Sequence, residues 1–350
     1  MVDNNEPVLV SLQELETGSI KLSTLEQAFG PTGLGILIVK ELPSNFQSLR
    51  LKLLSYISHL SFLPPDELEQ LTNAESHYNV GWSHGKEALK SGQYDTMKGS
   101  YYVGILSSYL QERLSRIPSD IRPTLETPNI WPSEELLPGF RSTFEELCTL
   151  IMDIILLVAR ACDRFAMEHV PDYASGLLER ILRESMTSRA RLLHYFPLDS
   201  QTKIAPADEN DDSWCALHVD DGCLTGLTSA LFVNETNLAH TIPLTPLKSA
   251  KSTDPKAGLY IRSRTCEVVK VSIPADCLAF QTGSALELIT GGALKAVPHF
   301  VRGPSGSSTM ERVARNTLAV FAQPNHEVIV DQESGVTFGE HTKEADERHA

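Results

Sequence analysis

The sequence predicts a mixed α/β chain with segregated elements, in which an antiparallel β sandwich or barrel in the second half is backed by helices. From residue 189 onward, short β-patterned runs follow one another without intervening helices, separated by Gly, Pro and Asp turns. Before that point, apolar residues from Phe140 to Phe165 recur at three- and four-residue steps, which predicts a long helix with one buried stripe.

The first half alternates a short strand with helices. The apolar run Ile36 to Val39 indicates a buried strand, and Phe46 to Leu60 has helical spacing. Residues 81–103 combine Gly, aromatic and polar residues without periodicity, so we expect an irregular segment that either covers a pocket or forms an ordinary surface loop. After the long helix, a second helix is expected over about 175–184.

The second half contains eight β-patterned runs. They cover residues 189–196, 215–220, 225–233, 258–263, 267–272, 277–282, 297–302 and 316–323. The segment 234–256 is rich in Thr, Pro, Lys and Ser, which predicts a long exposed excursion between strands. Residues 340–350 form a polar tail.

Composition restricts the class of partner. The chain has 350 residues with 41% hydrophobic content, enough for one large core or two smaller ones. A formal charge of −15 argues against nucleic-acid and anionic-membrane partners, which require clustered Lys and Arg, and favours a small-molecule substrate. The start MVDNNEPVLV lacks the features of a secretory signal, and six cysteines without CxxC spacing fit core positions in a reducing compartment. We therefore expect a cytoplasmic protein.

A candidate metal site is centred on His218-Val219-Asp220 in a predicted strand. Side chains at i and i+2 of a strand point to the same face, so His218 and Asp220 project together, while Asp221 projects away unless a bulge changes the phase. A third ligand should be a His on a late strand, and His299 in the run 297–302 offers one. Two His and one carboxylate form the facial triad typical of non-haem Fe(II) oxygenases, with open positions for substrate and O2.

A candidate anion site lies downstream. In Arg315-Asn316-Thr317 and the residues after it, Arg315 and Thr317 share a face with Ala319 and Phe321. A buried guanidinium requires an anion, and a carboxylate fits its planar fork. An ion pair with an internal Glu, or an exposed Arg at a strand end, would explain the same pattern. Among the other histidines, His84 and His194 are possible supporting groups around the metal.

These motifs resemble a known family. The string from His218 to Leu227 is similar to the HxDxGxLTxL signature of the isopenicillin N synthase-like branch of the Fe(II)/2-oxoglutarate-dependent dioxygenases, and Arg315-Asn316-Thr317 resembles its RxS motif. Further matches occur in the family's order, at 193–197, 258–261 and 282–292, with weaker ones at 81–83, 100–103 and 129–132. The resemblance covers about residues 8–340.

The resemblance implies a double-stranded β-helix (jelly-roll) core with Fe(II) on His218, Asp220 and His299. It implies that 2-oxoglutarate chelates the iron and is held at its far carboxylate by Arg315 and Thr317. His194 stands where many members have Asn, and Phe196 where many have a Tyr that contacts the cosubstrate, so His194 is included among the cofactor-binding residues. The implied activity uses O2 and 2-oxoglutarate to oxidise a C–H bond of a small metabolite by hydroxylation, desaturation or cyclisation.

Two alternatives share this fold. An Fe(II) oxidase that uses no 2-oxoglutarate would bind a substrate carboxylate at Arg315, and a non-catalytic relative would only bind a small molecule. For domain organisation, we expect a mostly helical region at 1–188 packed on the barrel, the oxygenase core at 189–330 and a C-terminal tail at 331–350.

Overall fold

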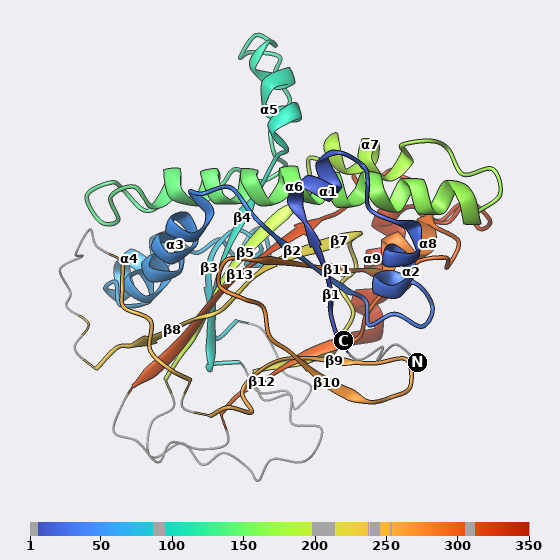
Figure 1. Cartoon of the computed structure of the whole chain (residues 1–350). Helices are drawn as coiled ribbons and strands as arrows, with labels where there is room; N and C mark the ends of the chain where they lie inside the picture. The colour runs from blue at the N-terminus through green and yellow to red at the C-terminus, as the bar shows by residue number, and fades with distance from the viewer. Residues whose placement is uncertain are drawn as a thin grey trace.

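The computed structural model describes residues 6–86, 95–197, 214–236, 238, 246–252, 254–304 and 312–349. Within these residues, two β-sheets lie one above the other, and a layer of helices covers the outer face of the larger sheet (Figure 1). Parts of the predicted excursion 234–256 fall outside the described residues.

Among the described residues, the larger sheet has the order β1-β2-β11-β7-β13-β5-β4-β3, with β8 also paired to β13. The smaller sheet has the order β10-β9-β12-β6. The larger sheet comprises β1 (Val8–Ser11), β2 (Ile36–Lys40), β3 (Gly81–His84), β4 (Lys98–Gly104), β5 (Arg189–Tyr195), β7 (Leu224–Thr228), β8 (Leu231–Asn234), β11 (Leu278–Thr282) and β13 (Val313–Ala322). The smaller comprises β6 (Cys215–His218), β9 (Gly258–Arg262), β10 (Val268–Val271) and β12 (His299–Arg302). From β5 to β7, and again from β10 to β13, successive strands alternate between the sheets, which is the double-stranded β-helix that was expected.

Helices flank this core. They are α1 (Leu12–Glu16), α2 (Leu22–Phe29), α3 (Phe46–Ser61), α4 (Pro65–Gln70), α5 (Ser108–Ser115), α6 (Phe140–His169), α7 (Leu177–Arg183), α8 (Ser284–Ile289) and α9 (Phe338–His349). The long α6 lies across the larger sheet, whereas α5 projects away from the body (Figure 1). The predicted long helix and the strand and helix near the N-terminus are therefore confirmed, with ends shifted by a few residues.

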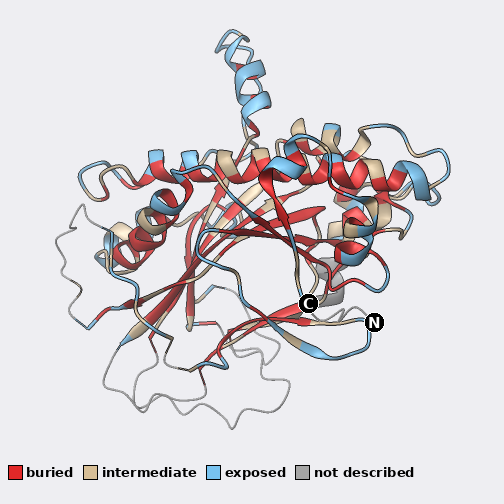
Figure 2. Cartoon of the chain, in the orientation of Figure 1, coloured by how far each residue is buried: buried red, intermediate tan, exposed pale blue. Residues whose placement is uncertain are grey.

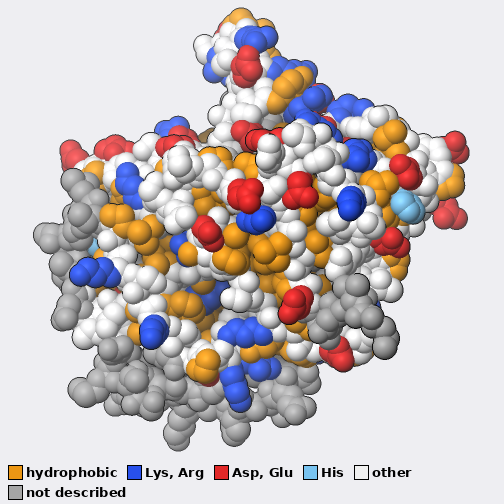
Figure 3. All heavy atoms as spheres, in the orientation of Figure 1, with side chains coloured by type: hydrophobic (Ala, Val, Ile, Leu, Met, Phe, Trp, Pro, Cys, Tyr) orange, Lys and Arg blue, Asp and Glu red, His pale blue; other side chains and the backbone are white. Residues whose placement is uncertain are grey.

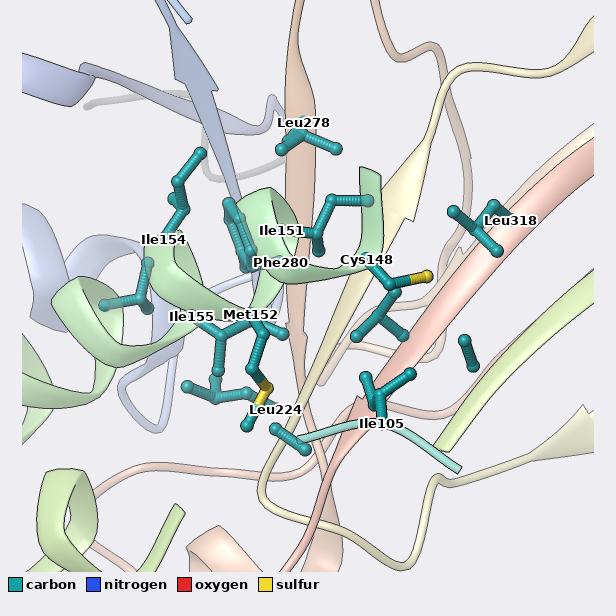
Figure 4. Close-up of a cluster of buried hydrophobic side chains, with 14 of the residues drawn as sticks. Ile105, Cys148, Ile151, Met152, Ile154, Ile155, Leu224, Leu278, Phe280 and Leu318 are labelled. Carbon is teal, nitrogen blue, oxygen red and sulfur yellow. The ribbon is translucent and has the colours of Figure 1, made fainter. Parts of the chain in front are cut away.

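The helix α6 packs directly on the sheet. Its side chains Ile151 and Ile155 lie among Phe280, Leu224 and Leu318 of the strands beneath (Figure 4). A Cβ added at Gly226 on β7 would lie 2.7 Å from Ile151, so a larger residue there would push α6 off the sheet.

The pleat of β13 separates two environments. Leu318 and Val320 belong to the large hydrophobic cluster under the helices, whereas Ala319 packs in a second cluster between the two sheets. Figure 2 shows that the strands of the larger sheet consist mostly of buried residues. The predicted two-residue alternation of this strand is confirmed, and it directs Arg315 and Thr317 to the space between the sheets.

One prediction for the first half was wrong. The described parts of 81–103 are not irregular, because β3 and β4 form an antiparallel pair that extends the larger sheet beyond β5, whereas residues 87–94 lie outside the described residues. Their Gly and Ser content lowers strand propensity, but pairing with β5 and the burial of Trp82 override it.

Two further details differ from expectation. The run 225–233 is two strands, β7 and β8, instead of one. The polar tail contains α9, which begins at the buried Phe338. The first half also contributes β1 to β4 to the larger sheet. The division at 188 and 330 stays a prediction.

The surface carries mixed charges on the face shown in Figure 3, where Lys and Arg lie among Asp and Glu over the helical layer. Among the described residues, no helix combines the length and apolar character needed to cross a bilayer.

Candidate active site

Three side chains converge between the sheets. His218 at the end of β6 and His299 at the start of β12 are direct cross-strand partners, with ring centroids 4.3 Å apart. Asp220 follows two residues after the end of β6, and its Oδ1 lies 3.5 Å from Nε2 of His218 and 3.8 Å from Nε2 of His299. One ligand atom from each residue lies within 4.8 Å of the others.

The backbone sets which nitrogen of each imidazole faces Asp220. Nδ1 of His218 lies 2.7 Å from the carbonyl of Ala216, and Nδ1 of His299 lies 3.1 Å from the carbonyl of Val297. A carbonyl only accepts, so each Nδ1 donates its proton there, and each Nε2 is the nitrogen directed at Asp220. This second contact orients the histidines that bind metals in proteins.

Asp220 is prepared as an anion. Its Oδ2 accepts a 2.5 Å hydrogen bond from the Thr225 hydroxyl, and the side chain is buried. Burial alone would raise the pKa of Asp220, but the imidazoles of His299 and His218, with the Thr225 hydroxyl, hold that pKa well below its usual range.

The same neighbours act on the imidazoles. Burial lowers the pKa of His299, with Asp220 opposing the shift. Burial would also lower the pKa of His218, but Asp220 and Cys215 raise it well above its ordinary value.

The turn after β6 explains why Asp220, and not Asp221, faces inward. The backbone carbonyl of Asp220 accepts a 2.8 Å hydrogen bond from the amide of Ser284, at the start of α8. A Cβ added at Gly283 would lie 2.2 Å from the carbonyl oxygen of Gly222, so the turn can approach this closely only because residue 283 is glycine.

These three residues fit a divalent transition metal. Two imidazole lone pairs and one carboxylate oxygen from one side are the donor set of the 2-His-1-carboxylate triad. Without a metal ion, His218 with its raised pKa carries the positive charge beside Asp220, and a divalent cation would replace that charge on binding.

The site opens into a cavity of about 240 Å³ between the sheets. Arg315 and Thr317 line it together with the three convergent side chains. Arg315 is 6% exposed, and its Nε and Nη1 have no hydrogen-bond partner among the described residues. Burial lowers the pKa of Arg315, and Tyr195 opposes the shift. Since an unpaired buried charge is costly, this guanidinium fits an anion in the cavity.

Sequence comparison gives one relative of known class. No protein-family model matches the chain. A curated 2-oxoglutarate-dependent dioxygenase of Gibberella zeae is 26% identical over 245 residues, which are 68% of this chain and 53% of that protein. The chain thus spans about half the length of that relative.

Solved structures resemble the chain over nearly its whole length. A full-length Neurospora crassa protein, solved in complex with alpha-KG, has a TM-score of 0.66 at 19% identity, over 99% of this chain and 97% of that one. A putative 2OG-Fe(II) oxygenase family protein of Caulobacter crescentus has a TM-score of 0.67 at 16% identity, over 99% and 100%. The chain has the fold of the Fe(II)/2-oxoglutarate-dependent oxygenases. The isopenicillin N synthase-like branch stays a prediction.

Within this oxygenase fold, one residue predicted from the sequence is misplaced. The pleat of β5 directs Arg191, Leu193 and Tyr195 to the cavity, so His194 lies on the opposite face. There its Nδ1 is 2.8 Å from Oδ1 of Asn316. His194 therefore does not contact the cavity, and its inclusion among the cofactor-binding residues was wrong.

Tyr195 is an aromatic residue that lines the cavity, and sequence reasoning missed it. The Arg315 guanidinium lies 5.0 Å from the centre of its ring, and the ring stacks on Trp214. Phe196 instead contacts His194 and His84. The motif alone predicts that His194 and Phe196 face the cavity, which is one position away from the residues that do. Nothing in the sequence of a short strand shows which of its two faces is turned to the cavity.

Gln281 is a second cavity residue that sequence reasoning missed. It lies on β11 directly opposite Thr225 and is fully buried. Neither its amide oxygen nor its amide nitrogen has a hydrogen-bond partner among the described residues. Only its place directly after the apolar run Leu278–Phe280 of a buried strand could have signalled it.

Three other side chains were considered in the sequence or lie beside the candidate ligands. Nε2 of His84 lies 3.0 Å from the carbonyl of Thr96, and His84 does not line the cavity. Cys215 does line it, with Sγ 3.8 Å from Nδ1 of His218. Cys223 is buried in the cluster under the helices, as expected of a core cysteine.

Proposed function

We propose that this protein is an Fe(II)- and 2-oxoglutarate-dependent oxygenase that uses O2 to oxidise a C–H bond of a small molecule. His218, Asp220 and His299 would hold the Fe(II), and Arg315 and Thr317 would hold the far carboxylate of 2-oxoglutarate. One observation carries the proposal: an oriented His-Asp-His set and a buried guanidinium without a hydrogen-bonded anion line the same cavity. The fold shared with the Neurospora crassa protein that was solved in complex with alpha-KG supports the same function.

Bound Fe(II) supplies activation of O2, coupled to oxidative decarboxylation of 2-oxoglutarate to succinate and CO2. The residues of the chain bind and orient the reactants. Arg315 offers two N–H donors to one carboxylate, and the Tyr195 ring limits how its guanidinium can turn. The apolar walls formed by Leu193, Leu227 and Ala319 reduce the water around the reacting groups.

The experiment measures 2-oxoglutarate binding without turnover. Mn(II)-loaded protein is titrated anaerobically with 2-oxoglutarate by calorimetry. Arg315→Gln should raise the Kd by about 30-fold or more, because truncating one partner of a buried charge pair costs about 2 kcal/mol or more. Arg302→Gln is the control, since Arg302 lies on β12 against the Tyr260 ring and outside the cavity.

Aerobic assays complete the test. With Fe(II) and a substrate from a metabolite screen, succinate release should disappear in His299→Ala. If the wild-type protein shows no affinity for 2-oxoglutarate but consumes O2 with a substrate, the Fe(II) oxidase alternative is correct. Retention of wild-type 2-oxoglutarate affinity in Arg315→Gln would refute the assignment of the anion site.

The proposal also places the protein in the cytoplasm. All six cysteines are free thiols, which supports a reducing compartment.

A further inference from the structure

A buried polar network lies directly behind the anion site. Asn316 stands between Arg315 and Thr317 on β13, so its side chain points to the opposite face, toward α3. Its Nδ2 donates to the carbonyl of Leu54 and to the Ser58 hydroxyl, both at 2.7 Å. Its Oδ1 accepts from Nδ1 of His194 at 2.8 Å. Three elements, β13, β5 and α3, are thus joined through one fully buried amide.

This network is unusual for its surroundings. The next residues on the same face of β13, Ala314 and Leu318, are fully buried and apolar. An apolar side chain at 316 would pack there without a requirement for partners, whereas an amide must find partners for its donors and its acceptor. Satisfied polar groups in a core fix one arrangement of the elements that they join, because any shift leaves them unpaired.

The anion site depends on that arrangement. Arg315 has no hydrogen bond of its own at Nε or Nη1 among the described residues, and its guanidinium lies against the Tyr195 ring. Tyr195 is the cross-strand partner of Arg315, just as His194 is the cross-strand partner of Asn316. The direction of the Arg315 guanidinium therefore depends on the register in which β13 pairs with β5. The Asn316 amide stabilises that register from the opposite face of β13.

We propose that Asn316, with His194 and Ser58, is a positioning residue for the anion site. The network keeps Arg315 and Thr317 directed into the cavity and so preorganises the binding of a dicarboxylate cosubstrate. This inference rests on the proposed function, because the anion it serves is the far carboxylate of 2-oxoglutarate.

The test compares variants in which the protein is destabilised either within the Asn316 network or elsewhere on the same face of β13. Asn316→Leu removes three hydrogen bonds at similar side-chain volume, and Ser58→Ala removes one of them if the first variant does not fold. The control is Val320→Ala, a cavity-forming change on the same face of the same strand, away from the network. Each protein is loaded with Mn(II) and titrated anaerobically with 2-oxoglutarate, and its Mn(II) affinity is measured separately.

We expect Asn316→Leu to raise the 2-oxoglutarate Kd by about tenfold, as removal of an orienting outer partner commonly does, with Mn(II) affinity unchanged. Ser58→Ala should raise it less. Val320→Ala should lower the urea midpoint and leave the Kd within about twofold. Variants that bind 2-oxoglutarate as tightly as the wild type would overturn the inference alone. A wild-type protein that does not bind 2-oxoglutarate would overturn both this inference and the proposed function.

Discussion

The carboxyl of Glu235 should make the stability of this protein fall as pH rises from about 4.5 toward 7. Glu235 follows β8 and is 3% exposed, so its carboxyl is shielded from water. The nearest basic group, Nε2 of His194, lies 3.8 Å from its Oε1, beyond hydrogen-bonding distance. Burial raises the pKa of Glu235 to about 7 from an ordinary value of 4.5, with Ser58 offsetting part of the effect.

The sign and size follow from linkage. Below pH 4.5 the carboxyl is protonated in both the folded and unfolded states, so its burial carries no charge penalty. Between that value and about 7 the unfolded state ionises first, and the free energy of unfolding falls as pH rises. A shift of this size corresponds to roughly 3 kcal/mol, lost in full above the folded pKa.

The substitution that tests this is Glu235→Gln, which keeps the shape and removes the charge. Urea denaturation at several pH values between about 5 and 8 should give a flatter pH dependence in the variant, and a variant more stable than the wild type at the alkaline end. Glu16→Gln, at an exposed position on α1, is the control. Wild-type and Glu235→Gln curves that run parallel across this range would refute the reasoning.

Three further predictions concern the metal end of the cavity. Thr225→Val removes the hydroxyl that binds Asp220 and should raise the Mn(II) Kd by about 10- to 100-fold in an equilibrium titration, whereas Thr228→Val should not. Gln281→Leu removes an unpaired buried amide and should raise the unfolding free energy of the ligand-free protein by about 1–3 kcal/mol in urea; a lowered midpoint would contradict this. Mn(II) at about 100 times its Kd should add about 2.7 kcal/mol to the unfolding free energy, EDTA should reverse the gain, and His299→Ala should abolish it.

The main elements and the candidate ligands follow from local pattern. Hydrophobic spacing predicts α6 because its apolar stripe is long enough to exclude other readings. The period-2 alternation of β13 predicts that Arg315 and Thr317 share a face. The spacing of two residues between His218 and Asp220 is enough to indicate a potential metal site. His299 on β12 is the cross-strand partner of His218 on β6.

Pattern fails where a tertiary contact decides the structure. The strands β3 and β4 have weak intrinsic preference for their conformation. They form because β5 offers an edge to β4, and β4 in turn offers one to β3. The seven-residue β5 could be read in either phase, and only its pairing with β13 shows that Tyr195 faces the cavity while His194 faces α3.

The sequence alone therefore determined the long helix α6, the β-patterned runs of the second half, the identity of the three convergent side chains and the arginine that awaits an anion. These features depend on spacing along one chain. Only the tertiary structure decided which nitrogen of each imidazole faces Asp220, the burial of Gln281 and the hydrogen-bond network of Asn316 behind Arg315. Hydrogen-bond partners and burial arise from segments distant in the sequence, and no local pattern carries that information.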